Sequence, residues 1–184
     1  MEVYTYYRKP LCVLGSVDTE RGREIAAELL KWLFKYEVHE VVHDGSLYEQ
    51  PALRYAQELS IKENRPVLYL HTKGAYNKPE RSRKIRKLWR REFQDGVDAL
   101  CWWRQCLPLV VCPFTGADRM TRYNGFWATP EAWKAIAPIE PSEDRMVFEK
   151  LWRDAKAVQI HGTVYEDITS ENLKKVHDYL NQHF

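Results

Sequence analysis

The chain has 184 residues, of which 45% are hydrophobic, and its formal net charge is +2. This length allows one domain with a full hydrophobic core, and the composition excludes a disordered chain. No apolar run approaches the roughly 20 residues that a membrane-spanning helix needs, and the first fifteen residues lack the pattern of a signal peptide. We therefore expect a soluble, cytoplasmic protein with a single domain over residues 1–184.

The predicted elements alternate between short apolar strands and amphipathic helices. The first part of the chain has strands at 3–7 and 11–14, a helix over 19–36, a strand at 38–42, a helix over 51–62 and a strand at 67–70. A helix over 81–106, which Gly96 could break, and a strand at 109–112 follow, and then polar irregular chain over 115–123. The last part has a stretch over 124–129 that continues into a helix over 130–136, a helix over 140–156, a strand at 157–160 and a helix over 170–181. This alternation predicts an α/β fold: a Rossmann-like, three-layer α/β/α domain with a mostly parallel central sheet. Ligands of such sheets bind beyond the carboxyl ends of the strands.

The apolar run at 67–70 ends in His71-Thr72-Lys73-Gly74. In an extended segment residues i and i+2 point the same way, so His71 and Lys73 would face one ligand, with Thr72 between them. An imidazole and an ammonium group suit phosphate oxygens, and Gly74 lets the backbone approach a ligand closely. The alternative is a strand end that meets a polar turn, with His71 bonded to a backbone carbonyl, and spacing alone does not separate the two.

Eight basic residues lie between Lys78 and Arg91, although the chain as a whole is nearly neutral. Such a run is typical of a solvent-exposed helix face, and it could also hold phosphates. Within it Trp89 is most simply a core residue, whereas Arg90 could turn back towards the strand ends and bind a diphosphate.

The four cysteines form no Cys-x-x-Cys pair and have no histidine at metal-ligand spacing. Each of Cys12, Cys101, Cys106 and Cys112 lies in an apolar stretch. This pattern predicts buried, reduced thiols and no metal site.

A second group of candidates lies in the stretch from Tyr123 to Ala128. Asn124 can hydrogen-bond a sugar hydroxyl through its amide, Gly125 would leave room for that sugar, and Trp127 offers a flat apolar face. The alternative is a turn at the Asn-Gly pair followed by packed aromatic side chains.

Three further residues are candidates for chemistry. Asp144 and Glu149 lie around a predicted helix start and could supply a general base, although surface carboxylates are commoner than catalytic ones. His161 follows the last predicted strand and is a candidate by the strand-end rule. The chain lacks the glycine-rich and serine motifs of NTPases, dinucleotide-dependent dehydrogenases and α/β-hydrolases, which argues against these classes.

Several stretches together resemble a family of uncharacterised glycosyltransferase-like proteins: YEQPALRYAQELS with VLYLHTKGA, then LWRREFQD, then YNGFWATPEAW and EDRMVFEKLW. That family shows a Tyr-Glu-x-Pro helix start, a strand ending in His-Thr-Lys-Gly, a Trp-Arg pair, a Ser-Gly-Asn-Phe-Trp-Trp-like stretch and an acidic helix with Glu-x-x-Trp. The resemblance spans residues 48–152. Here Asn124-Gly125 reverses the Gly-Asn order, and Ala128 stands where the second Trp would be.

The resemblance implies a nucleotide-diphosphosugar transferase fold of the GT-A type. Such enzymes usually end a central strand in Asp-x-Asp, which binds Mn²⁺ or Mg²⁺ on the donor diphosphate, and here His71-Thr72-Lys73 takes that place. Fixed positive charge can neutralise a leaving diphosphate as a metal does. The resemblance thus implies metal-independent transfer of a sugar from a nucleotide-diphosphosugar to a glycan or other hydroxyl acceptor. The implied roles are diphosphate binding by Lys73 and Arg90 with His71, Thr72 and Gly74, sugar or acceptor binding by Asn124, Gly125, Trp127 and His161, and base catalysis by Asp144 or Glu149.

Other functions remain open from the sequence. Without Asp-x-Asp, the domain could be a catalytically degenerate module that binds a nucleotide sugar or a glycan. Nucleic-acid binding through the basic run is not expected, because the net charge is near neutral. The same basic helix could make a peripheral contact with acidic lipid head groups.

Overall fold

A computed structural model describes residues 9–73, 75, 79–94, 107–116, 118–142, 146–168 and 172–184. Its centre is a six-stranded sheet with the order β2-β1-β3-β5-β4-β6, in which β5 alone runs antiparallel to its neighbours. The strands are β1 (Leu11–Val17), β2 (Glu37–His43), β3 (Val67–His71), β4 (Leu109–Phe114), β5 (Phe126–Ala128) and β6 (Gln159–Tyr165). The expected α/β fold with a mostly parallel sheet is confirmed.

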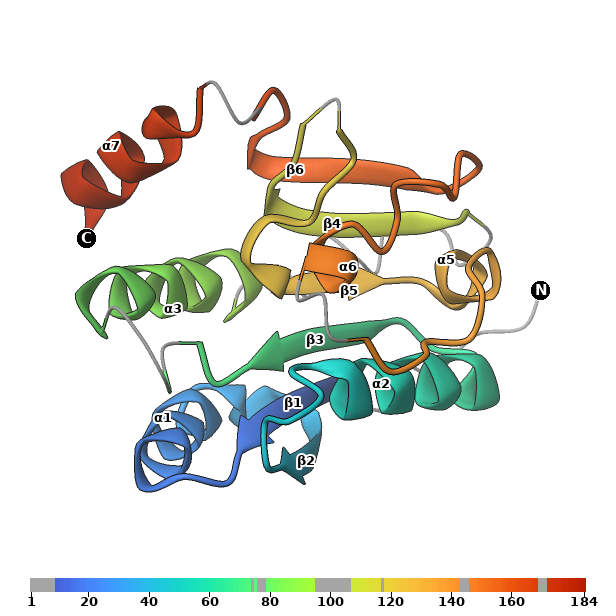
Figure 1. The fold of residues 1–184 in the computed structure, drawn as a ribbon, viewed down its shortest axis with the longest axis horizontal. Helices are drawn as coiled ribbons and strands as arrows, with labels where there is room; N and C mark the ends of the chain where they lie inside the picture. The colour runs from blue at the N-terminus through green and yellow to red at the C-terminus, as the bar shows by residue number, and fades with distance from the viewer. Residues whose placement is uncertain are drawn as a thin grey trace.

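Helices cover both faces of the sheet (Figure 1). They are α1 (Glu20–Leu30), α2 (Gln50–Glu63), α3 (Pro79–Gln94), α5 (Pro130–Lys134), α6 (Met146–Glu149) and α7 (Lys174–His183), with 3-10 turns η1 (Leu33–Lys35) and η2 (Arg122–Asn124). The buried residues of α1, α3 and α7 belong to one core, and those of α2, α5 and α6 belong to the other. Among the described residues, no helix combines the length and apolar character needed to cross a bilayer.

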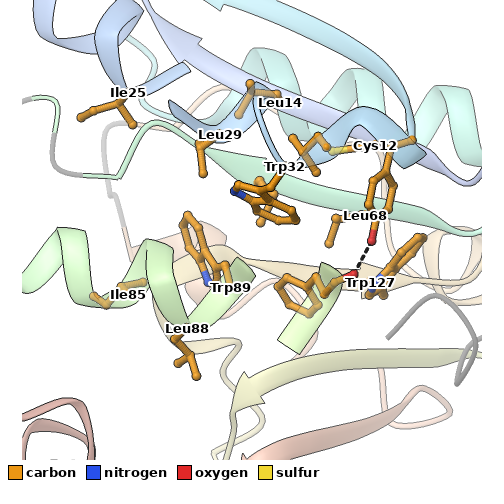
Figure 2. Packing of buried hydrophobic residues seen from close by; sticks show 14 of the residues in the cluster. Cys12, Leu14, Ile25, Leu29, Trp32, Leu68, Ile85, Leu88, Trp89 and Trp127 are labelled. Atoms are coloured by element: carbon orange, nitrogen blue, oxygen red, sulfur yellow. Dashed lines mark hydrogen bonds between the residues drawn. The ribbon is translucent and has the colours of Figure 1, made fainter. Parts of the chain in front are cut away.

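The strands supply both cores because successive side chains point to opposite faces. In β1, Leu11 and Val13 pack towards α2, whereas Cys12 and Leu14 pack towards α1 and α3. Figure 2 shows the core between the sheet and helices α1 and α3, where Trp89 of α3 lies among side chains from α1 and the sheet. Such two-sided burial explains why these strands read as continuous apolar runs.

Two of the four cysteines lie in the described chain, and both confirm the expected buried thiols. Burial raises the pKa of Cys12 and raises that of Cys112 to about 12. These thiols are therefore protonated and inert at neutral pH. Cys101 and Cys106 lie outside the described residues, as do the expected strand at 3–7 and the expected break at Gly96.

The sequence does not predict strand β5, since its three residues belong to the stretch over 124–129 that is expected to continue into a helix. Its Trp127 is opposite Leu68 of β3 on one side and Val111 of β4 on the other. A three-residue strand is too short to show an alternating pattern, so only its neighbours in the sheet define it.

The expected helix over 140–156 is wrong over most of its described length. Residues 140–142 are not helical, helix α6 spans only Met146–Glu149, and residues 150–158 form turns and bends. The guanidinium of Arg119 donates to the carbonyl oxygen of Ala155 over 3.0 Å and to that of Val158 over 2.5 Å. Because Arg119 supplies hydrogen-bond donors to these carbonyl oxygens, the segment after α6 does not need helical hydrogen bonds to satisfy them.

Candidate functional site

The strand order reverses between β1 and β3. After β1 the chain leads to β2 on one side, and after β3 it leads to β4 on the other. In open α/β sheets, ligands bind beyond the carboxyl ends of strands at such a reversal. The predicted stretch starts at this place, since His71 is the last residue of β3 and lies opposite Gly15 of β1. Gly74 lies outside the described residues.

Thr72 joins the ends of β1 and β3. Its N–H donates to the carbonyl oxygen of Gly15 over 2.9 Å, and its hydroxyl accepts from the N–H of Val17 over 3.2 Å. The side chain is buried. Its hydroxyl therefore fixes the site from within the protein.

A buried network of polar side chains surrounds the end of β3. Nδ1 of His71 lies 2.6 Å from Oε1 of Glu49, the residue before α2. The other carboxylate oxygen of Glu49 accepts from Nδ2 of Asn124, and Nε2 of His71 lies 3.2 Å from the carbonyl oxygen of Tyr123. His71, Glu49 and Asn124 are at most 9% exposed. The network thus joins the start of α2, the end of β3 and η2.

Both ring nitrogens of His71 face protein acceptors. Nδ1 faces a carboxylate oxygen of Glu49 and Nε2 faces the carbonyl oxygen of Tyr123, and neither of these groups can donate a hydrogen bond. His71 therefore supports the site from inside. The carbonyl contact is the alternative that the sequence left open for this residue.

The turn before β5 has an uncommon backbone. Tyr123 has a φ of 69° and Asn124 a φ of 49°, both in the left-handed region that non-glycine residues rarely adopt. His71 holds the carbonyl of Tyr123, and Glu49 holds the side chain of Asn124. The buried His71–Glu49 pair therefore fixes a strained turn, a combination typical of functional sites.

Two cations meet on the ring of Tyr123. Nζ of Lys73 lies 5.4 Å from the ring centroid, and the guanidinium carbon of Arg81 lies 5.2 Å from it. Arg81 also donates from Nη2 to the Tyr123 hydroxyl, while its Nε is buried without a hydrogen-bond partner in the described part of the chain. Two cations on one ring repel each other, and an anion bound between them would relieve this repulsion.

Arg86 fixes the backbone that carries Lys73. Its Nη1 donates to the carbonyl oxygen of Lys73 over 2.7 Å, and its Nη2 and Nε donate to the two carboxylate oxygens of Glu28 in α1. The Arg86 side chain is 2% exposed. This buried guanidinium holds α1, α3 and the end of β3 in one arrangement.

The electrostatic surroundings favour the ionised form of Glu49. Burial alone would raise the pKa of its carboxyl group, but His71, Lys73 and the amide of Asn124 outweigh burial and lower that pKa below the ordinary value. Lys73 therefore favours the ionised form of Glu49 in addition to its contact with the Tyr123 ring.

Acid should destabilise the wild type more steeply than Glu49→Gln. A folded-state pKa below the unfolded value of about 4.3 gives a contribution that is complete above that value and is lost as the pH falls through the folded pKa. His43, whose pKa is lowered by burial and then by His71, acts in the same direction at higher pH in both proteins. Urea unfolding from about pH 7 to about pH 3 tests this, and equal slopes for the two proteins would contradict it.

Gly125 and Trp127, the expected sugar-binding pair, lie against protein side chains. A Cβ at Gly125 would lie 2.2 Å from Nε1 of Trp89, so this glycine makes room for the Trp89 indole. Trp127 is 3% exposed, and its ring packs 5.8 Å from that of Tyr36. Both residues therefore help to pack the core behind the strand ends.

Arg90 and His161 are not brought to the end of β3. Arg90 is exposed and donates to the side chain of Gln94 on the same helix. His161 lies within β6, opposite Val111, with Nδ1 2.5 Å from a carboxylate oxygen of Glu166. Strands β4 and β5 separate it from β3.

The structure describes the two candidate bases to different extents. Asp144 lies outside the described residues, and of Glu149 only the backbone is described, at the end of α6. Helix α6 contacts η2, the turn that carries Tyr123 and Asn124. The role of Glu149 as a base stays a prediction.

Sequence reasoning missed Glu49, Arg81 and Arg86. Glu49 belongs to the Tyr-Glu-x-Pro start that carried the resemblance, so a signal for it was present. Arg86 lies four residues after Ser82 and three before Trp89, both buried, so helical spacing places it on the inner face of α3. That spacing would have favoured Arg86 over Arg90 as the inward-facing arginine.

Comparison of the chain with models of protein families, with curated proteins and with solved structures gives no match. The resemblance therefore depends on its motifs alone. Among the described residues, no three His, Cys, Asp or Glu side chains are grouped so that they could hold a metal ion.

Proposed function

We propose that the chain binds a nucleotide-diphosphosugar at the carboxyl ends of β1 and β3 and transfers its sugar to a glycan or another hydroxyl acceptor, on a fold of the GT-A type. One observation carries the proposal: Lys73 and Arg81 converge on Tyr123 where the strand order reverses, and Nε of Arg81 is buried without a partner among the described residues. A diphosphate carries the charge and the acceptor oxygens that two such cations require.

In this mechanism Lys73 and Arg81 stabilise the charge that develops on the leaving diphosphate. Arg86 holds the backbone of Lys73, and His71 with Glu49 holds the turn that carries Tyr123. The cations are therefore fixed before the donor binds, so little reorganisation is needed during transfer. The acceptor hydroxyl needs a general base, and Glu149 and Asp144 are the proposed groups.

A second candidate is a module that binds a nucleotide sugar or glycan without turning it over. The observation that favours it is the state of Glu49, the carboxylate within the buried network. Glu49 is 9% exposed and both of its oxygens accept hydrogen bonds from neighbours, so the carboxylate is poorly accessible to an acceptor hydroxyl.

The proposal is tested by thermal unfolding with UDP-, GDP-, CMP- and dTDP-sugars, in EDTA and then with Mn²⁺. A donor at a hundred times its dissociation constant should stabilise the fold by about 2.7 kcal/mol. Lys73→Ala and Arg81→Ala should each weaken binding by about tenfold or more, because each removes a charged hydrogen-bond donor. Arg54→Ala, an exposed arginine on α2, is the control and should bind as the wild type does.

A shift that survives EDTA and is lost in both variants supports metal-independent recognition of the diphosphate. A shift that requires Mn²⁺ contradicts that mechanism, and the absence of a shift with every donor contradicts the proposed function. Release of nucleoside diphosphate from a bound donor then separates the transferase from the binding module.

A further inference from the structure

On the outer surface of α1 and α3, several exposed cations lie apart from the carboxylates of the described chain, whereas on α2 and α5 the exposed cations have carboxylate neighbours. The exposed residues of α3 include Arg83, Lys87 and Arg90, which follow one another at helical spacing along one stripe. The ion pairs of α3 within the described chain are made by other residues, namely Lys84, Arg86 and Arg91. The stripe therefore presents three cations without a carboxylate at ion-pair distance in the described structure.

Helix α1 and η1 extend this surface. Lys31 and Lys35 are exposed, and neither has a carboxylate at ion-pair distance in the part of the chain that the structure describes. The carboxylates that face outwards from the middle of α1 are occupied, since Glu24 pairs with Arg21 and Glu28 pairs with Arg86. The surface is thus positive even though the whole chain carries a net charge of only +2.

Two apolar side chains are exposed next to Lys31 and Lys35 in the chain. Phe34 is 62% exposed and Leu30 is 38% exposed, and Nζ of Lys35 lies 6.0 Å from the Phe34 ring. The segment that carries Phe34 is held beside the last turn of α3, because the hydroxyl of Tyr36 donates to the carbonyl oxygen of Phe93. Apolar and basic side chains therefore share one surface.

The opposite face lacks this combination. On α2 and α5 the exposed cations have carboxylate neighbours: Arg54 lies 3.0 Å from Glu58, and Lys134 lies 3.6 Å from Glu131. Figure 1 shows α1, α3 and α7 along one side of the molecule, away from α2 and α5. The cations of α1, η1 and α3 that are unpaired within the described chain therefore lie on one side of the molecule.

We propose that this surface, formed by Leu30, Lys31, Phe34, Lys35, Arg83, Lys87 and Arg90, docks on a membrane that contains anionic lipid. Lipid head groups supply the negative charge that the five cations require, and the interface accepts an exposed aromatic ring beside lysines. A soluble polyanion would satisfy the cations but would leave Phe34 and Leu30 in water. Helix α3 carries Arg81 of the candidate site near its start, so docking would bring that site close to the lipid surface. This inference does not depend on the donor or on catalysis.

The test is flotation of the full chain with vesicles of phosphatidylcholine alone and with about one third phosphatidylserine, at about 0.05 M and about 0.5 M salt. We expect binding to the anionic vesicles at low salt and weak or no binding to the neutral ones. Reversal of the stripe (R83E, K87E and R90E together) should weaken binding by about tenfold or more. The matched control reverses Arg54, Lys62 and Lys134 on the opposite face and should bind as the wild type does.

Phe34→Ser separates a membrane from other polyanions. It should weaken binding to the anionic vesicles about threefold or more while leaving binding to inorganic polyphosphate unchanged. Failure of the wild type to float with anionic vesicles at low salt would overturn the proposal, as would equal losses in the two charge-reversed proteins. Tighter binding to a single-stranded oligonucleotide than to the vesicles would also overturn it. Far-ultraviolet circular dichroism of each variant establishes that the fold is kept.

Discussion

Replacement of Glu49 by alanine is expected to lower the free energy of unfolding by about 3–5 kcal/mol. The change leaves the imidazole of His71 buried without its carboxylate partner, and it removes the acceptor for the amide of Asn124. Removal of one partner from a buried pair costs more than the pair contributes, because the remaining charge stays desolvated. Urea unfolding followed by circular dichroism measures the loss.

The control for this variant is Glu58→Ala on the same helix. Glu58 also has a basic partner, Arg54 at 3.0 Å, but the Glu58 side chain is 62% exposed. Exposed pairs contribute at most about 1 kcal/mol, so this variant should remain close to the wild type. Equal losses for the two variants would show that burial of the Glu49 pair has no special effect.

A double-mutant cycle tests whether the loss passes through His71. If the buried charge causes the instability, removal of both charges should be less damaging than the sum of the two single changes. Glu49→Gln and His71→Gln keep the volumes of the side chains nearly constant and are the appropriate pair. Additive losses would indicate that the two side chains stabilise the fold independently, against the 2.6 Å contact between them.

The same network explains why a buried charged pair is useful at this place. Glu49 immediately precedes α2, His71 ends β3, and Tyr123 with Asn124 leads into β5, so three separate parts of the chain meet in one set of hydrogen bonds. Apolar packing would not dictate which way the carbonyl of Tyr123 and the ring attached to it must point. Directional bonds to charged groups do, and they hold a backbone conformation that is costly in isolation.

The alternation of strands and helices was sufficient to predict the class of fold, because the apolar runs and amphipathic spacings are local. Strand β3 is the clearest case, since Val67–Leu70 are buried on both faces and read as a continuous apolar run. Strand β5 and the turns after α6 were missed for the opposite reason. The first is defined by its two neighbouring strands and the second by the guanidinium of Arg119, and both are contacts between distant segments.

The candidate site divides in the same way. The strand-end rule predicted that Lys73 lies just beyond a strand, and the structure confirms this position after β3, because it needs only the position of one strand. The reversal of strand order at this place is known only from the structure. The partners of Lys73 could not be read from the sequence, because Arg81 and Tyr123 reach it from another helix and another turn. The aromatic residues that suggested a sugar platform lie in the core, where composition alone does not distinguish packing from binding.

Gly125→Ala is expected to destabilise the fold by about 3 kcal/mol, and the reason distinguishes two roles for this glycine. If Gly125 made room for a sugar, an added methyl group would weaken ligand binding and leave the stability nearly unchanged. In the structure the added Cβ would lie 2.2 Å from Nε1 of Trp89, a rigid ring that is 1% exposed. The loss should therefore appear in urea unfolding without any ligand.

The matched test removes the obstacle. Trp89→Leu alone should be destabilising, because Trp89 lies in the packed core of Figure 2 and a smaller side chain would leave a cavity there. In that background Gly125→Ala should cost much less than in the wild type, because the atoms that the new methyl group would strike are gone. An undiminished cost in the double variant would mean that the backbone at Gly125, and not the Trp89 ring, excludes a side chain. A stable Gly125→Ala protein with weakened nucleotide-sugar binding would instead return Gly125 to the ligand.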